Sequence, residues 1–146
     1  MRVAPGHLPR PLVPARLLLA EDDAELRSLL ASSLREDGFE VVEVSDGNSL
    51  VDRLADAMAA DGSLDGFDLV VSDIRMPGFS ALEVMTGMRR MLFRTPVVLI
   101  TAFGDPKVHE RAKRLGAALV LDKPFDVDEL RAAVTKLVKQ RWQRDG

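Results

Sequence analysis

The fold is decided by residues 69–78, whose sequence is LVVSDIRMPG. The stretch begins as a short apolar run, which is typical of a strand buried inside a sheet. It then reaches Asp73 and breaks at a Pro-Gly pair, which predicts a turn. Open α/β sheets bind their ligands beyond the carboxyl ends of the strands, so Asp73 is a candidate reactive group.

From residue 16 onward, short apolar runs alternate with longer amphipathic segments. This alternation predicts a parallel sheet covered by helices. The apolar runs that predict strands are residues 17–20, 39–44, 67–71, 96–100 and 118–121. Apolar side chains at helical spacing predict five helices, within Leu26–Leu34, Leu50–Met58, Leu82–Met91, Pro106–Leu115 and Val127–Val138. The sequence therefore predicts an α/β domain of five strands and five helices.

Composition excludes several classes of protein. The 146 residues are 47% hydrophobic and 29% charged, which fits one globular domain with a core. The net charge of −3 provides no basic footprint, so we do not expect this chain to bind nucleic acid directly. The absence of cysteine excludes a disulfide framework and a Cys-based zinc site. The longest apolar runs are far shorter than the ~20 residues that cross a bilayer, so no membrane segment is expected.

We expect three segments along the chain. Residues 1–15 contain four prolines and lack the apolar core of a signal peptide, which indicates a flexible leader on a cytoplasmic protein. Residues 16–140 are the expected domain, and residues 141–146 the expected C-terminal tail.

Polar side chains stand at the ends of four predicted strands. Glu21 and Asp22 follow the first strand, Asp73 the third, Thr101 the fourth and Lys123 the fifth. Taken one at a time, these residues can be explained as helix caps, strand formers or a surface lysine. If the sheet is parallel, however, they meet at one edge, where crowded carboxylates repel each other. Mg²⁺ relieves such repulsion and also suits a phosphate oxygen, so the pattern predicts a metal and phosphate site.

Five short elements occur in a specific order: LLAEDD at residues 18–23, DIRMPG at 73–78, ITAFGD at 100–105, GA at 116–117 and KPF at 123–125. With this ordered set, residues 16–140 resemble the receiver domain of two-component response regulators. The resemblance implies a flavodoxin-like (βα)5 fold with a doubly wound parallel sheet and strand order 2-1-3-4-5. It also implies a cis peptide bond between Lys123 and Pro124.

The resemblance assigns a role to each matching residue. Asp73 is expected to accept a phosphoryl group, while Thr101 and Lys123 contact the phosphoryl oxygens. An aspartate is a competent nucleophile for this transfer once its charge is screened.

A magnesium site is implied beside the acceptor. Its expected ligands are Glu21, Asp22, Asp73 and the backbone carbonyl of Arg75. Asp23 is expected to cap the following helix instead.

Two other functions compete with this interpretation. A phosphatase of the haloacid-dehalogenase type also uses a strand-end aspartate, but it has a second aspartate two residues later, where this chain has Arg75. We therefore expect no turnover enzyme. A degenerate receiver would use the fold only as a phosphorylation-independent binding module, and it is expected to lose an acidic residue, the acceptor or the lysine. This chain keeps all of them, which favours phosphorylation.

One position departs from the family pattern. Many receivers carry an aromatic residue three positions before the lysine, and here that position is Val120. A valine has one stiff rotor and cannot make a large swing, so the signal is expected to travel through the backbone after Thr101 and through the helix at Pro106–Leu115. Phe103 is expected to flank the phosphoryl group and slow its loss.

The resemblance also implies partners. The phosphoryl donor is expected to be a sensor histidine kinase or a histidine phosphotransfer protein. The face formed by the fourth helix, fifth strand and fifth helix is the expected contact for a partner or for a homodimer. His109 lies on the fourth predicted helix without a ligand cluster in the sequence around it, and is expected to be a surface residue.

Overall fold

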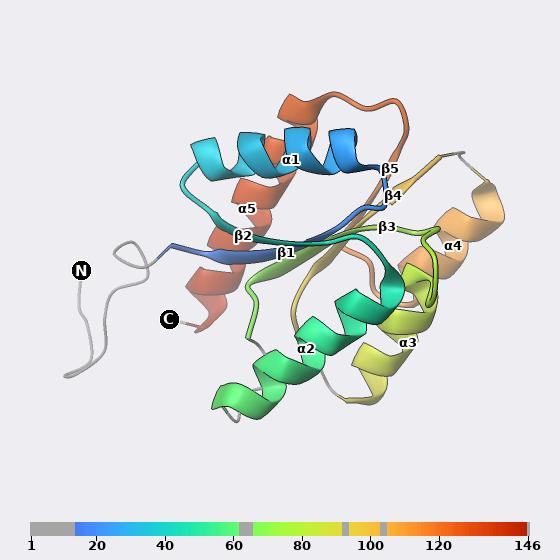
Figure 1. The fold of residues 1–146 in the computed structure, drawn as a ribbon, viewed down its shortest axis with the longest axis horizontal. Helices are drawn as coiled ribbons and strands as arrows, with labels where there is room; N and C mark the ends of the chain where they lie inside the picture. The colour runs from blue at the N-terminus through green and yellow to red at the C-terminus, as the bar shows by residue number, and fades with distance from the viewer. Residues whose placement is uncertain (1–13, 62–65, 92–93, 103–104, 146) are drawn as a thin grey trace.

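The computed structural model describes residues 14–61, 66–91, 94–102 and 105–145, and the side chains of all of these except 58–61, 144 and 145. Five strands alternate with five helices along the chain (Figure 1). The strands are β1 (Arg16–Ala20), β2 (Glu40–Val44), β3 (Leu69–Asp73), β4 (Val97–Thr101) and β5 (Leu119–Asp122). The helices are α1 (Ala24–Glu36), α2 (Gly47–Asp61), α3 (Ala81–Arg90), α4 (Pro106–Arg114) and α5 (Val127–Asp145). The expected number and order of elements is confirmed.

The strands form a single parallel sheet in the order β2-β1-β3-β4-β5. This arrangement confirms the flavodoxin-like fold and its strand order. Because every strand runs in the same direction, the carboxyl ends of all five lie along one edge. The strand order changes direction between β1 and β3, and in open α/β sheets this is the point where ligands bind.

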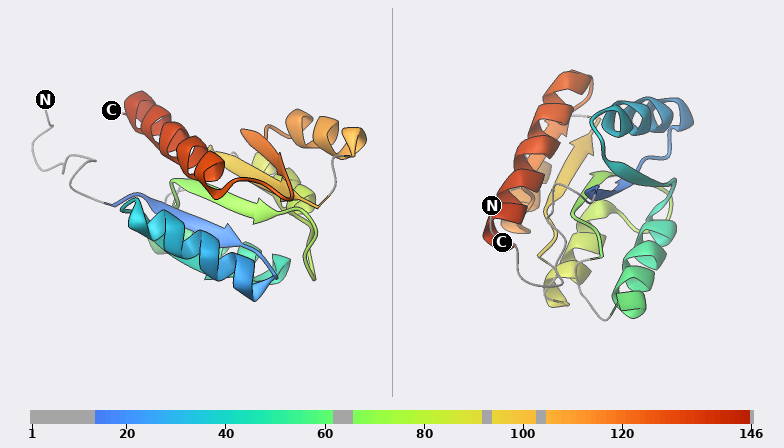
Figure 2. Two further views of the ribbon diagram at one scale, coloured as in Figure 1. Left: turned by 90° about the horizontal axis from the view of Figure 1, so that it is seen from above. Right: turned by 90° about the vertical axis from the view of Figure 1, so that its left-hand side faces the viewer.

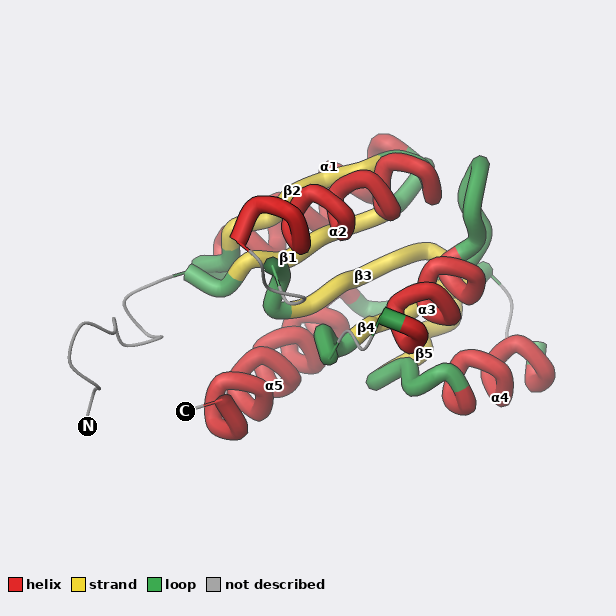
Figure 3. The backbone as a smooth tube through the Cα atoms, turned by 90° about the horizontal axis from the view of Figure 1, so that it is seen from below, coloured by secondary structure: helices red, strands yellow, loops and turns green. Residues whose placement is uncertain are grey.

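Helices cover both faces of the sheet (Figure 2). α1 and α5 pack on one face, and α2, α3 and α4 pack on the other, which is the side seen in Figure 3. Successive residues of β1 point to opposite faces: Leu17 and Leu19 join the core under α1 and α5, whereas Leu18 joins the core under α2 and α3. Burial on both faces explains why the central strands read as continuous apolar runs rather than as an alternating pattern.

Local signals in the sequence set the ends of the helices. Asp23 caps α1, because its carboxylate accepts hydrogen bonds from the backbone N–H groups of Glu25 and Leu26. Ser80 and Glu83 form a reciprocal capping box at the start of α3. Gly38, which follows α1, has a φ of +91°, a conformation that favours glycine at the end of a helix. The expected cap at Asp23 is thereby confirmed.

Residues just outside the expected range 16–140 also contact the domain. Ala15, placed in the leader by the sequence, is buried, and its carbonyl accepts a hydrogen bond from the N–H of Glu40. α5 continues past residue 140 to Asp145, with Arg141 buried and Trp142 packed against the core. A boundary at residue 140 would therefore cut a helix that is still in contact with the domain. In the described part of the chain, no helix has the length and apolar character needed to cross a membrane.

Candidate functional site

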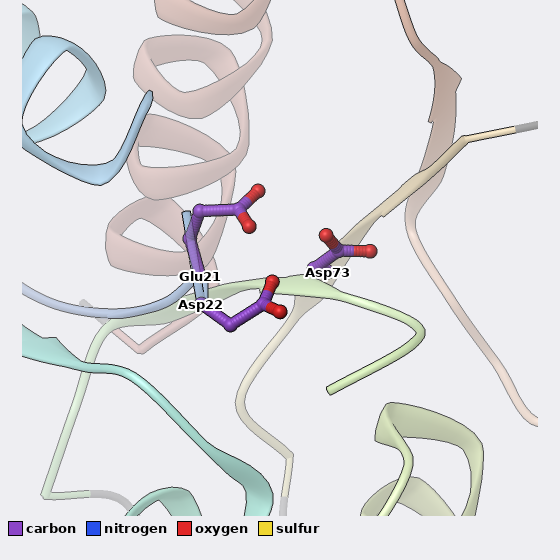
Figure 4. A group of neighbouring side chains, drawn as sticks. All are labelled: Glu21, Asp22 and Asp73. Atoms are coloured by element: carbon purple, nitrogen blue, oxygen red, sulfur yellow. The ribbon is translucent and has the colours of Figure 1, made fainter. Parts of the chain in front are cut away.

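Three acidic side chains meet at the switch point of the sheet. Glu21 and Asp22 directly follow β1, and Asp73 is the last residue of β3. The two strands are hydrogen-bonded neighbours, with Ala20 in register with Ser72, so the acidic residues lie side by side. One carboxylate oxygen from each of the three lies within 4.8 Å of the other two, and Figure 4 shows these carboxylates turned toward the same space.

The members of this acidic cluster differ in exposure. Glu21 is completely buried and Asp73 is 6% exposed, whereas Asp22 is exposed. One oxygen of Glu21, Oε2, accepts a hydrogen bond from the N–H of Asp23 at 3.1 Å. The other, Oε1, is buried without a well-oriented hydrogen bond to any described residue. This buried oxygen lies 3.1 Å from the ammonium of Lys123, and a carboxylate oxygen can also contact a further cation.

Lys123 brings a positive charge to the cluster from the loop after β5. Its Nζ lies 2.8 Å from Asp73 Oδ2 and 3.1 Å from Glu21 Oε1. Its backbone N–H also donates to the carbonyl of Thr101 at 2.7 Å, which fixes the loop against the end of β4. The peptide bond between Lys123 and Pro124 is cis, which confirms the expectation from the resemblance.

Burial and charge shift two pKa values in this cluster. Burial is the main cause that raises the pKa of Glu21 from 4.5 to about 7, and the charge of Asp73 adds to the effect. The Asp23 N–H and the Lys123 ammonium oppose this rise, but only in part. Burial would lower the pKa of Lys123, yet its contacts with Asp73 and Glu21 outweigh burial and raise it. The lysine is therefore charged at neutral pH, and Glu21 is near its titration midpoint.

The other expected site residues lie at the same edge of the sheet. Thr101 is the last residue of β4, the strand next to β3, and is buried. Arg75 lies two residues after Asp73, and its backbone N–H donates to Asp73 Oδ1 at 3.3 Å. Val120, in β5, is half-buried and packs against the core under α2, α3 and α4. Phe103 falls outside the described residues.

The structure also reveals contacts that sequence reasoning missed. His109 on α4 hydrogen-bonds through Nε2 to Asp122 Oδ1 at 2.8 Å, so it links α4 to the end of β5 rather than standing alone on the surface. Gly47, at the start of α2, donates its N–H to the carbonyl of Pro77 in the loop after β3. No sequence signal relates these residues, because each pair is joined only by the packing of separate elements.

The donor set of the acidic cluster fits a magnesium ion. Glu21, Asp22 and Asp73 supply only oxygen ligands, which hard divalent cations prefer. Bringing the three carboxylates together is unfavourable unless a positive charge is nearby, and Lys123 neutralises only part of their negative charge. A cation bound beside Lys123 would add positive charge next to the carboxylate of Asp73.

Comparison with known proteins identifies the family that shares these features. The model of the response regulator receiver domain matches residues 17–135. Transcriptional regulatory protein PdtaR of Mycobacterium tuberculosis is 36% identical over 129 residues, which cover 88% of this chain and 58% of PdtaR. Sporulation initiation phosphotransferase F of Bacillus subtilis is 28% identical over 121 residues, which cover 83% of this chain and 91% of that protein. Among solved structures, chemotaxis protein CheY4 of Vibrio cholerae superposes with a TM-score of 0.71 at 27% identity, covering 86% of this chain and 99% of CheY4.

Relatives of this chain differ in length. The chain spans a little over half of PdtaR but nearly all of the Bacillus phosphotransferase. The matched region, residues 17–135, includes all five strands except Arg16, the first residue of β1, and it contains the residues of the acidic cluster.

Proposed function

Because the chain belongs to the family of response regulator receiver domains, we propose that it is a phosphoacceptor in a two-component phosphorelay. Asp73 is the acceptor, and Glu21, Asp22, Asp73 and the backbone carbonyl of Arg75 hold Mg²⁺. The observation that carries this proposal is the position of Asp73 between a buried acidic cluster and the Lys123 ammonium, 2.8 Å from its Oδ2. A carboxylate that served only to solvate the end of a strand would need neither the acidic cluster nor the Lys123 ammonium beside it.

The transfer follows from the chemistry of these groups. A carboxylate oxygen of Asp73 attacks the phosphorus of a phosphohistidine on the partner protein, an O–P bond forms, and the P–N bond breaks with its electron pair returning to the imidazole. Lys123 and Thr101 stabilise the negative charge on the transferring oxygens, because both residues lie at the edge of the sheet where Asp73 ends β3. Mg²⁺, when held by the acidic cluster, would supply further positive charge beside the transferring group.

The proposed role is that of a switch rather than of a turnover enzyme. Phosphorylation adds negative charge at the ends of β3, β4 and β5, where Thr101 and the loop at Lys123 are joined by the hydrogen bond from Lys123 N–H to Thr101 O. Val120 leaves no aromatic side chain to relay the change, so we propose that the backbone after Thr101 and α4 carry it. A sensor histidine kinase or a phosphotransfer protein is the proposed donor, and the α4-β5-α5 face is the proposed surface for a partner or a second copy.

Mass spectrometry with a small phosphodonor such as acetyl phosphate tests the acceptor. Wild type is expected to gain the mass of one phosphoryl group when Mg²⁺ is present and none after chelation. Asp73→Asn should remain unlabelled, whereas Asp56→Asn, which removes an exposed carboxylate on α2, should label like wild type. Equal labelling of Asp73→Asn and wild type would exclude Asp73, and a wild type that is never labelled by either a phosphodonor or a kinase would favour a degenerate receiver.

A further inference from the structure

The loop between β3 and α3, residues 74–80, connects the acceptor to the proposed metal site. It begins directly after Asp73 and includes Arg75, whose N–H donates to Asp73 Oδ1 at 3.3 Å. Its first residue, Ile74, is bonded on both sides: its N–H donates to Ile100 O, and its carbonyl accepts from Ala81 N. Its last residue, Ser80, is held by the capping box of α3. Both ends of the loop are thus fixed by hydrogen bonds.

The middle of this loop lies against the first turn of α2. Gly47 N–H donates to Pro77 O at 2.9 Å. Gly78 has a φ of +83°, and a side chain added to it would come within 2.9 Å of Asn48 Oδ1. Residues 46–49 are themselves ordered, because Asp46 Oδ1 accepts a hydrogen bond from Ser49 N–H at 2.7 Å. The N-terminal turn of α2 therefore provides a surface on which the loop lies.

This contact is possible only without a side chain at residue 47. A Cβ on Gly47 would lie 1.9 Å from the carbonyl oxygen of Phe79, 2.6 Å from its nitrogen and 2.7 Å from its carbonyl carbon. All three are backbone atoms, so no side-chain rotation can relieve the overlap. Either the loop or the start of α2 would have to move.

Burial indicates which of the two would move. Leu50, one turn into α2, is 1% exposed and belongs to the core under α2 and α3. In the loop, Met76 is partly buried against the same core, but Arg75, Pro77, Gly78 and Phe79 are all exposed. Because closely packed cores resist displacement, the exposed loop would yield. The loop carries Arg75, so its displacement would reach both the hydrogen bond to Asp73 and the proposed carbonyl ligand.

We propose that Gly47 is a positioning residue for the magnesium site. Because Gly47 has no side chain, α2 can support the loop that presents the Arg75 carbonyl and orients Asp73. This inference depends on the proposed function for the identity of the metal. It adds a residue from a third element, α2. Gly47 lies outside the acidic cluster and has no side chain that could bind the ion.

Calorimetric titration of the whole chain with Mg²⁺ tests this inference without requiring phosphorylation. Gly47→Ala is expected to weaken Mg²⁺ binding roughly 10-fold or more, as loss of support for a metal ligand commonly does. Labelling by acetyl phosphate should then need correspondingly more Mg²⁺, while its rate at saturating Mg²⁺ recovers toward that of wild type.

Two other glycines provide matched controls. A Cβ on Gly66 would lie 2.3 Å from Ala57 Cβ, so Gly66→Ala also forces α2 to adjust, but near the other end of that helix and away from the loop. A Cβ on Gly87, within α3, would meet nothing within 4 Å, so Gly87→Ala adds a methyl group without overlap. Both controls should bind Mg²⁺ like wild type. The proposal is overturned if Gly47→Ala binds Mg²⁺ normally, or if Gly66→Ala weakens binding equally.

A second variant covers the case in which Gly47→Ala does not fold. Gly78→Ala disturbs the same contact from the loop side, and it should also weaken Mg²⁺ binding. Unchanged binding would contradict the proposal.

The experiment also separates this inference from the proposed function. If wild type binds Mg²⁺ and Gly47→Ala does not, the positioning role stands even if no phosphodonor labels Asp73.

Discussion

Lys123 lies between two carboxylates and partly neutralises both. Its ammonium is 2.8 Å from Asp73 and 3.1 Å from Glu21, and only 26% of its side chain is exposed. At such distances in a partly buried site, the attraction is stronger than between the same groups in water. In the proposed transfer, the ammonium is expected to exchange part of its contact with Asp73 for an incoming phosphoryl oxygen.

Replacing this lysine should slow phosphorylation more than it affects folding. Lys123→Met keeps most of the aliphatic stem but removes the charge, and we expect the labelling rate at saturating Mg²⁺ to fall about 10²–10³-fold, the usual effect of losing one fixed charge-stabilising donor. Lys107→Met, an exposed lysine at the start of α4, is the control and should label normally. The time course of mass gain measures both rates, and equal rates would remove Lys123 from the mechanism.

Glu21 should make magnesium binding depend on pH. Burial raises the pKa of Glu21 to about 7, so in the metal-free protein this carboxyl takes up a proton as the pH falls through 7. The ion needs the ionised form, so its apparent affinity should fall by up to roughly tenfold per pH unit below 7 and level off above it. Calorimetric titrations at pH values on either side of 7 measure the effect.

The same shift has a consequence for stability. Without metal, the folded state holds a proton on Glu21 between pH 4.5 and 7 that the unfolded state releases, so the contribution of Glu21 to stability should decrease as the pH rises through this window.

The variant Glu21→Gln tests the pH dependence of magnesium binding. It removes the titrating group, so it should bind Mg²⁺ more weakly than wild type and with an affinity that no longer changes with pH. A wild-type affinity that does not change between pH 6 and 8 would show that Glu21 is not the titrating ligand.

At the scale of elements, α1 shows how sharply burial divides neighbouring residues. Leu30 is completely buried against the sheet, whereas Leu29 is 53% exposed. Leu30→Ala should lower the free energy of unfolding by about 2–5 kcal/mol, because it leaves a cavity in the core, and Leu29→Ala should change it by less than about 0.5 kcal/mol. Urea denaturation followed by circular dichroism measures both. Similar losses for the two variants would mean that α1 packs on a different face.

The elements were predictable from the sequence where one local pattern decides them. The apolar run before Asp73, the cap at Asp23 and the stop at Gly38 each act within a few residues, and the structure confirms them. That acidic side chains and Lys123 come together was predictable because the ends of parallel strands meet at one edge, whereas their roles stay predictions. The contacts of Gly47 with Phe79 and of His109 with Asp122 were not, since they arise from packing between elements that are distant in the chain.

At the scale of the whole molecule, Asp68 joins the start of the sheet to the end of the last helix. Its Oδ2 accepts a hydrogen bond from the backbone N–H of Arg16 at 2.7 Å, and its Oδ1 accepts one from Trp142 Nε1 at 3.2 Å. Trp142 also packs against the core between the sheet and the helices α1 and α5. The final turns of α5 are therefore part of the folded domain.

Removing this contact should destabilise the protein without altering the site. Trp142→Ala, or deletion of the residues after Gln140, is expected to lower the free energy of unfolding by about 2 kcal/mol, since a half-buried aromatic side chain and its hydrogen bond are lost. Gln143→Ala, at an exposed neighbouring position, is the control. Chemical denaturation measures the loss, and an unchanged midpoint in the deletion variant would show that the last turns contribute nothing.

The position of Trp142 also determines what an optical experiment on this protein can report. It is the only tryptophan in the chain, and it contacts the residue just before β3, whereas Asp73 is the last residue of that strand. At a rise of about 3.3 Å per residue, the indole and the acceptor are separated by roughly 16 Å of strand. Tryptophan fluorescence should therefore change on global unfolding but hardly at all on phosphorylation. A kinetic assay of the switch will require a fluorophore introduced near α4.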